Sequence, residues 1–366
     1  MLAAPSTATD DSALRAAVES CGASLAGDVY GPQALRDDSG VSFERLRSGA
    51  VALLPDHGLL ALTGDDRIRF LHSMTTQDAE HQPLAQARWH GLCTPKGRLV
   101  ATMLAWRDPA SLLLLLPRPQ AEAVRKRLSM YVLRAKVRIE DRCDASAVLG
   151  VCGERATDAL ALLGLPAPQA LGVAHAAPGA DATAIGLPAI DGGAPDPSGS
   201  LTRWLLVVPA ASLAAVWARL AASLEPVGSV TWRWTDVRSG IARIVPATVE
   251  QFVPQMINFD AIGGVSFDKG CYPGQEIVAR SHYLGKVKRR VFLGHLAGAE
   301  PAPGSEVFGD TAESIGRVVV AAPAPGGGAD LLFEAQAAAA GRTGTLCIDG
   351  RPLRIEALPY PLPEIG

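Results

Sequence analysis

The chain has 366 residues, of which 48% are hydrophobic and 19% are charged, a composition typical of a globular protein with two or three domains. Its formal net charge of −3 gives no overall attraction to nucleic acid or to anionic lipid. We therefore expect neither a membrane nor a directly bound nucleic acid as a partner.

Residues 1–44 are rich in Ala, Ser and Gly, and we expect a loosely attached N-terminal extension there. The first thirty residues carry four acidic side chains and lack a basic start followed by an apolar run, so they do not resemble a secretory signal. These features favour a cytoplasmic protein.

Strands and helices mix between residues 45 and 150. A strand is predicted over "AVALLPDHGLLALTG" (50–64), and a helix follows in "TGDDRIRFLHSMTTQD" (63–78). The turn "TPKG" (94–97) joins two β-prone runs and predicts a hairpin. The run "SLLLLLP" (111–117) is far shorter than the roughly 20 residues of a membrane-spanning helix and predicts a buried strand. A helix over 117–133 and an alternating strand over 134–141 follow.

A second series of strands and helices occupies residues 147–223, interrupted by a mixture of Gly, Pro, Ala and Asp that predicts a mobile loop near 176–201. Residues 45–284 should thus form two α+β subdomains. From about 285 to 366 only strand-like pieces separated by Pro/Gly turns remain, which predicts a small all-β, barrel-like C-terminal domain. The expected fold class is α+β.

Six cysteines are scattered along the chain without any C-x-x-C pair, which argues against a disulfide framework and against a local zinc or iron–sulfur site. We expect no metal site. Most of these cysteines are typical small buried side chains.

Cys271 is different, because it lies in "FDKGCYPGQEIVARSHYLGKVKRR" (267–290) between two glycines and before a cationic run. Gly270 and Gly274 give the backbone freedom, and a nearby Lys269 would favour the thiolate, which is both a nucleophile and a metal ligand. Two interpretations remain open: a structural turn beside a solvated cationic face, or a loop that presents a reactive thiol.

The segment "KGCYPGQE" closely resembles the K-G-C-[FY]-x-G-Q-E signature of the YgfZ family of folate-binding proteins, which are linked to iron–sulfur cluster assembly or repair. That family is structurally related to the T-protein (aminomethyltransferase) of the glycine cleavage system. Weaker likeness in "LTGDDRIRFLHSMTTQD", "TPKGRL" and "MYVLRAKV" extends the resemblance over roughly residues 45–300. It implies a body around a central cavity that binds tetrahydrofolate or a derivative, and iron–sulfur proteins as partners.

The resemblance also implies roles for individual residues. Cys271 and Lys269 match the signature cysteine and lysine and are expected to carry the chemistry. The residues expected to bind the cofactor are Trp232, His57, Arg134, Gln275 and Glu276. Four of these five have an ordinary alternative: a core tryptophan for Trp232, a surface charge on a strand for Arg134, and a polar anchor of the loop for Gln275 and Glu276.

The alternative function is a folate-dependent one-carbon transferase of the T-protein type, and a plain interaction scaffold is a third. T-proteins carry acidic residues after their hairpin turn, where this chain has Val100, Ala101 and Thr102, which cannot supply a general base. Aminomethyl transfer is therefore disfavoured. Arg238 also departs from the family, because it stands where a carboxylate is usual.

Overall fold

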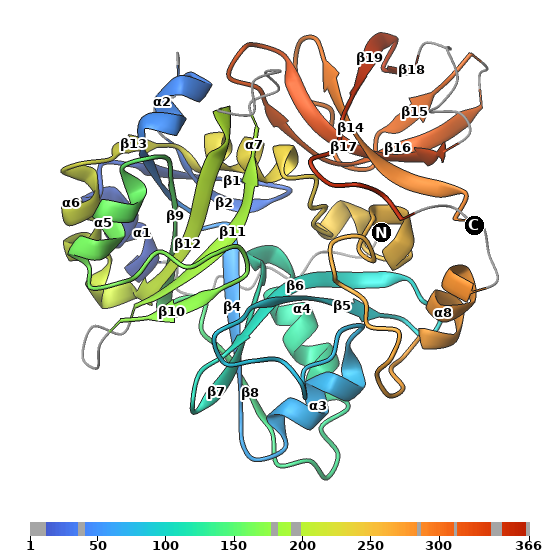
Figure 1. Ribbon diagram of the computed structural model, residues 1–366, viewed down its shortest axis with the longest axis horizontal. Coiled ribbons are helices and arrows are strands. Elements are labelled where there is room, and N and C mark those ends of the chain that lie inside the picture. Colours follow the sequence, from blue (N-terminus) through green and yellow to red (C-terminus); the bar gives the residue numbers. More distant parts are fainter. Residues whose placement is uncertain are drawn as a thin grey trace.

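The computed structural model describes residues 12–35, 41–176, 182–191, 199–283, 287–310, 313–337 and 346–363. Within these ranges the chain forms two sheets that face each other and a separate barrel (Figure 1). No helix of the described part is long and apolar enough to cross a membrane.

Five antiparallel strands form the first sheet, in the order β5 (Arg88–Cys93), β6 (Leu99–Arg107), β7 (Ser111–Pro117), β4 (His57–Thr63) and β8 (Arg138–Asp141). Helices α3 (Arg67–Met74) and α4 (Arg118–Ser129) cover one face of it. Because successive strand residues point to opposite faces, Leu60 and Leu114 pack toward these helices, whereas Leu59 and Leu115 face the second sheet. The hairpin predicted at 94–97 and the buried strand at 111–117 are both present.

The second sheet has six strands, in the order β10 (Val173–His175), β11 (Thr183–Ile190), β12 (Leu201–Pro209), β9 (Ser146–Cys152), β3 (Ala50–Leu53) and β13 (Glu225–Val227). Helices α1 (Ser12–Ser20), α5 (Ala156–Leu162) and α6 (Leu213–Ala221) pack on its outer face. On its inner face, Val148 and Leu205 share one apolar cluster with Leu59 and Leu115 of the first sheet. This shared cluster holds the two sheets together.

The remaining elements connect strands of the two sheets or lie between the sheets and a closed six-stranded barrel. They are the hairpin β1 (Ser24–Asp28) and β2 (Gly31–Leu35), the helices α2 (Phe43–Ser48), α7 (Ser229–Arg238) and α8 (Gln275–Tyr283), and the short 3₁₀ turns Ala210–Ser212, Pro246–Thr248 and Pro254–Ile257. The barrel order is β14 (Arg289–Leu296), β17 (Ala329–Gln336), β16 (Ser314–Pro323), β15 (Glu306–Phe308), β18 (Leu346–Ile348) and β19 (Arg351–Glu356). The predicted α+β body and barrel-like C-terminal region are thus confirmed.

Three local expectations were wrong. The single strand predicted over 50–64 is two strands in different sheets, because the chain turns at Pro55 and Asp56 between β3 and β4. The loop predicted near 176–201 contains strand β11, which pairs with β12, while 177–181 and 192–198 lie outside the described residues. The strand predicted over 134–141 is confined to β8, so Arg134 is not on a strand.

The N-terminal segment is also more firmly packed than expected. Val18 and Cys21 are buried under the second sheet. Tyr30, at 5% exposure, donates a hydrogen bond from its hydroxyl to the carbonyl of Ala321 in the barrel, at 3.3 Å. The described part of the extension therefore packs against both the second sheet and the barrel. The domain boundaries at 45 and 285 stay predictions.

A buried ion pair fixes the barrel to the body, and its loss tests that connection. The two terminal nitrogens of the Arg290 guanidinium donate to the Asp260 carboxylate, at 2.6 and 3.0 Å, with side chains 3% and 6% exposed. Arg290→Ala should lower the free energy of unfolding by about 3–5 kcal/mol, because Asp260 stays buried without its cation. In denaturant titrations, Arg280→Ala is the control, since the Arg280–Glu276 pair is exposed and should contribute little. Equal losses in both variants would contradict this expectation.

Candidate functional site

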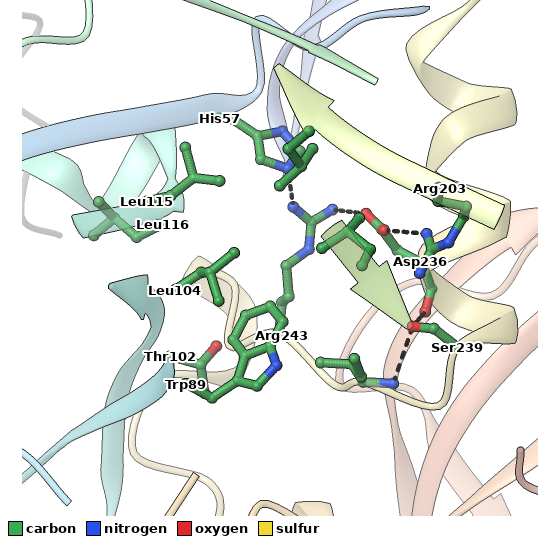
Figure 2. Close-up of a pocket in the computed structure, with 13 residues that line it drawn as sticks. His57, Trp89, Thr102, Leu104, Leu115, Leu116, Arg203, Asp236, Ser239 and Arg243 are labelled. Atoms are coloured by element: carbon green, nitrogen blue, oxygen red, sulfur yellow. Dashed lines mark hydrogen bonds and ion pairs between the residues drawn. The ribbon is translucent and has the colours of Figure 1, made fainter. Parts of the chain in front are cut away.

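A pocket lies between the two sheets and beside α7 (Figure 2). The space between atoms there totals about 490 Å³, of which only about 30 Å³ admits the centre of a water molecule. Its walls are apolar around Trp89, Leu104 and Leu187, and Thr102 and Ser239 contribute hydroxyl groups to its lining. A planar ligand would find apolar walls and hydrogen-bonding groups here, but side chains must move apart to admit it.

A series of paired charged side chains, some buried and some half-buried, crosses the polar end of the pocket. The carboxylate of Asp236 accepts a hydrogen bond from Arg203 at 2.9 Å and lies 3.1 Å from the guanidinium of Arg243. Arg243 in turn lies 2.8 Å from Nε2 of His57, whose Nδ1 lies 3.0 Å from Asp56. Because arginine only donates, Nε2 of His57 must accept, and the ring proton sits on Nδ1 facing Asp56.

Burial and pairing determine how these charged side chains ionise. Burial raises the pKa of Asp56, but His57 and Arg243 outweigh that effect, and the pKa lies below its ordinary value. Burial lowers the pKa of Arg203, which is 1% exposed, against the opposing effect of Asp236. We infer that Asp56 is ionised, since it faces His57 and Arg243.

The residues expected to bind the cofactor do not all line the pocket. His57 lines the pocket. Trp232 is 2% exposed and packs on Gly150, one layer behind the pocket, with the guanidinium of Arg203 5.6 Å from its ring centre. Its Nε1 is buried without a hydrogen-bond partner among the described residues. Arg134 is exposed and does not line the pocket.

Sequence analysis missed the charged residues of the pocket: Arg203, Asp236 and Arg243. Arg203 stands inside the apolar run "RWLLVV", and Asp236 follows "WRWT", so a charge in an apolar context was the available signal. Of the three residues that replace the T-protein carboxylates, Thr102 reaches the pocket, where its hydroxyl accepts the amide of Ile244 at 3.1 Å.

Cys271 lies outside this pocket, in the segment 267–274, which we call the thiol loop. Cys271 is exposed, whereas Cys21, Cys93, Cys143 and Cys152 are buried and Cys347 is half-buried. The thiol loop lies against the hairpin turn 94–97: a Cβ on Gly274, at φ +83°, would come within 2.4 Å of the carbonyl oxygen of Thr94 and 2.7 Å of Gly97. Only glycine allows this approach of the two backbones.

Lys269 anchors the thiol loop to α3. Its ammonium donates to the carbonyls of His72 and Thr75 at the end of that helix. Burial lowers the pKa of Lys269 to about 8 from its ordinary 10.5. Gln275 donates to the Lys269 carbonyl at 3.4 Å, so Gln275 braces the thiol loop.

The other charges of the motif are largely paired. Glu276 is exposed on α8, 3.5 Å from Arg280. Arg289 binds Glu334, and Arg290 binds Asp260, so these two cations are committed to carboxylates rather than to the thiol. Neither Cys271 nor the other motif residues line the central pocket, and α8 lies away from β11 and β12 in Figure 1.

Comparison with known proteins decides the family. No family model matches the chain. It is 32% identical over 291 residues to the tRNA-modifying protein YgfZ of Vibrio vulnificus (strain YJ016), covering 78% of this chain and 83% of the relative. It is 30% identical over 255 residues to the protein of that name from Yersinia pestis (strain Pestoides F), covering 69% and 73%. The chain belongs to the YgfZ family.

The fold expected for a YgfZ protein is confirmed as well. The glycine cleavage system aminomethyltransferase T of Bartonella henselae superposes with a TM-score of 0.72 at 16% identity, covering 95% of this chain and 96% of that one. At this identity the likeness establishes the fold alone.

Arg238, the residue that departs from the YgfZ pattern, pairs with carboxylates in the structure. It is 5% exposed and binds Glu356 of the barrel, with Asp191 at 3.2 Å and Asp330 at 3.5 Å. It does not line the central pocket. The substituted cation therefore joins α7 to the barrel.

The lowered pKa of Lys269 predicts a pH effect on stability. Between pH 8 and 10.5 the unfolded chain binds more protons at this position than the folded chain, so the folded state gains stability as the pH rises. The unfolding free energy of the wild type minus that of Lys269→Met should therefore increase from pH 7.5 to 9.5. Lys126→Met is the control, because Lys126 is 69% exposed. A difference independent of pH would contradict the expectation.

Proposed function

We propose that the protein is a tetrahydrofolate-binding accessory protein that supports the assembly, repair or maintenance of iron–sulfur enzymes through Cys271. The observation that carries the proposal is the contrast between Cys271, exposed on a tightly braced loop, and the buried cysteines elsewhere. A structural cysteine needs no exposure, whereas a thiol that reacts with a partner does.

The central pocket supports the folate part of the proposal. Its apolar walls suit a flat pterin ring, and His57, Asp236 and Arg243 offer donors and acceptors to the polar edge of that ring. The unpartnered Nε1 of Trp232 supplies a further buried donor close behind. When bound, the folate would supply one-carbon or redox chemistry, while these residues bind and orient it.

The iron–sulfur part rests on family membership and on the thiol. Relatives carry the name tRNA-modifying protein, and we propose that iron–sulfur enzymes acting on tRNA are among the clients. A protein-held cluster takes about four ligands, so Cys271 alone would share any cluster with a partner or contact it briefly.

A one-carbon transferase of the T-protein type is the alternative. Asp236 is the carboxylate that the structure places in the pocket, but two arginines hold it as an ion-pair partner. Each oxygen of this carboxylate faces an arginine, so neither is free to take a proton from a folate amine.

The folate proposal predicts binding that depends on the pocket and not on the thiol. Tetrahydrofolate should bind the wild-type chain with a Kd near the micromolar range, about −8 kcal/mol. His57→Ala should weaken it about tenfold or more, because it removes one hydrogen-bonding side chain from the pocket and leaves Arg243 without that partner. Cys271→Ser is the control and should bind as wild type does in calorimetry. Absence of binding to the wild type would refute the folate proposal.

The thiol proposal predicts a separate effect in cells. In a strain that lacks its own protein of this family, Cys271→Ser should fail to restore the activity of iron–sulfur enzymes that modify tRNA, measured as the modified nucleoside content. Cys347→Ser, which changes the half-buried cysteine of the barrel, should restore it. Full restoration by Cys271→Ser would instead favour an interaction scaffold.

A further inference from the structure

His72 lies directly beneath the thiol loop. A Cβ built on Gly270 would lie 3.7 Å from Nε2 of His72, the one heavy atom within 4 Å among the described residues other than the two chain neighbours of Gly270. Lys269, the preceding residue, donates to the backbone carbonyl of His72. Two successive residues next to Cys271 thus lie against His72.

The imidazole of His72 is oriented by a carboxylate. Its Nδ1 lies 3.0 Å from Asp78, and the two side chains are 13% and 18% exposed. Asp78 also accepts the backbone amide of His81 at 3.0 Å and faces the imidazole of His81 at 2.7 Å. Burial raises the pKa of Asp78, but these hydrogen bonds hold it well below its usual range. An ionised Asp78 places the proton of neutral His72 on Nδ1 and leaves Nε2 as an acceptor toward the thiol loop.

The thiol is available to that acceptor. Cys271 is exposed, and no hydrogen bond joins its sulfur to any residue of the described ranges. Cys271 directly follows Gly270, and a Cβ built on Gly270 would lie 3.7 Å from Nε2. Hydrogen bonds between a nucleophile and its base are often long or poorly aligned before a reaction partner binds, so we expect the contact between the sulfur and Nε2 to form when a partner binds.

We propose that His72, oriented by Asp78, is the base that removes the proton from the thiol of Cys271. This inference rests on the proposed thiol function. The proton passes from the sulfur to Nε2, which leaves a thiolate beside an imidazolium, and no electrons are exchanged. Asp78 is a positioning residue that stabilises the imidazolium. The order nucleophile, base and orienting carboxylate is the arrangement that activates nucleophiles in many enzymes.

Other ionisable groups lie near the pair, and their effects on the thiol must be distinguished from the effect of His72. Burial lowers the pKa of His90 to about 3, so it is neutral near pH 7. The Lys269 ammonium also favours a thiolate, but its pKa near 8 places its titration above that of an ordinary histidine. Further ionisable groups around the thiol loop and α3 include Asp268, His81, Glu80, Arg88, Glu276, Arg280 and His282.

The reactivity of the thiol tests the proposal on the full-length chain. Iodoacetamide alkylates a thiolate by forming an S–C bond while the C–I bond breaks and iodide leaves, and the modified Cys271 peptide is quantified by mass spectrometry from pH 5.5 to 9. His72→Gln keeps an amide that can donate to Asp78 but has no titratable nitrogen. At pH 6.5 this variant should react about tenfold more slowly than wild type, with its midpoint moved up toward about 8.5.

His282→Gln is the matched control, because the His282 ring stacks on Phe267 of the same thiol loop at 3.7 Å. It should react as wild type does, and all variants should melt at the wild-type temperature. The proposal is overturned if His72→Gln keeps the wild-type rate and midpoint, or if only His282→Gln shifts them.

The same variants separate this inference from the function it rests on. If His72→Gln slows alkylation while Cys271→Ser still supports iron–sulfur enzymes in cells, the base assignment stands and the proposed function fails. If His72→Gln is alkylated as fast as wild type while Cys271→Ser fails to support iron–sulfur enzymes in cells, the base assignment fails and the proposed function stands.

Discussion

The pairing of buried charges is the constraint on which the rest of the structure depends. Arg203 comes from the second sheet, Asp236 from α7, and His57 from the first sheet, with Arg243 between them. A charge in such surroundings is strongly unfavourable unless an opposite charge or a donor accompanies it. The two sheets and α7 must therefore keep one relative placement, and the pocket is the space that this placement leaves.

The same rule explains why the cationic motif does not simply surround the thiol. Arg290 pairs with Asp260, Arg289 pairs with Glu334, and Lys269 donates to carbonyl groups at the end of α3. These groups position the backbone on both sides of Cys271. The motif thus combines positively charged residues that hold the structure with one thiol that the structure leaves accessible.

Local features of the fold could be predicted from the sequence, and non-local ones could not. The "TPKG" hairpin and the barrel strands follow from turn residues and alternation within a few positions. The separation of β3 and β4 into two sheets depends on partners about 50 to 100 residues away, since β3 pairs with β9 and β4 with β7 and β8. Strand β11 was hidden by its Gly- and Pro-rich surroundings.

The candidate site shows the same division. Cys271 was singled out by neighbouring glycines, and His57 by family resemblance. The pairing of Asp236 with Arg203 and Arg243 escaped notice, because no sequence pattern joins residues on separate elements. His72 was expected only as part of a helix.

The bracing of the thiol loop has a consequence for association. Lys269 and Gln275 tie its two ends to α3 and to each other, and Gly274 locks it against the hairpin turn. A partner that docks there meets a surface already in its final shape, so little conformational entropy is lost in ordering it. Recognition of Cys271 then resembles the fitting of two rigid bodies, and even a small contact area can give a complex that forms and dissociates quickly.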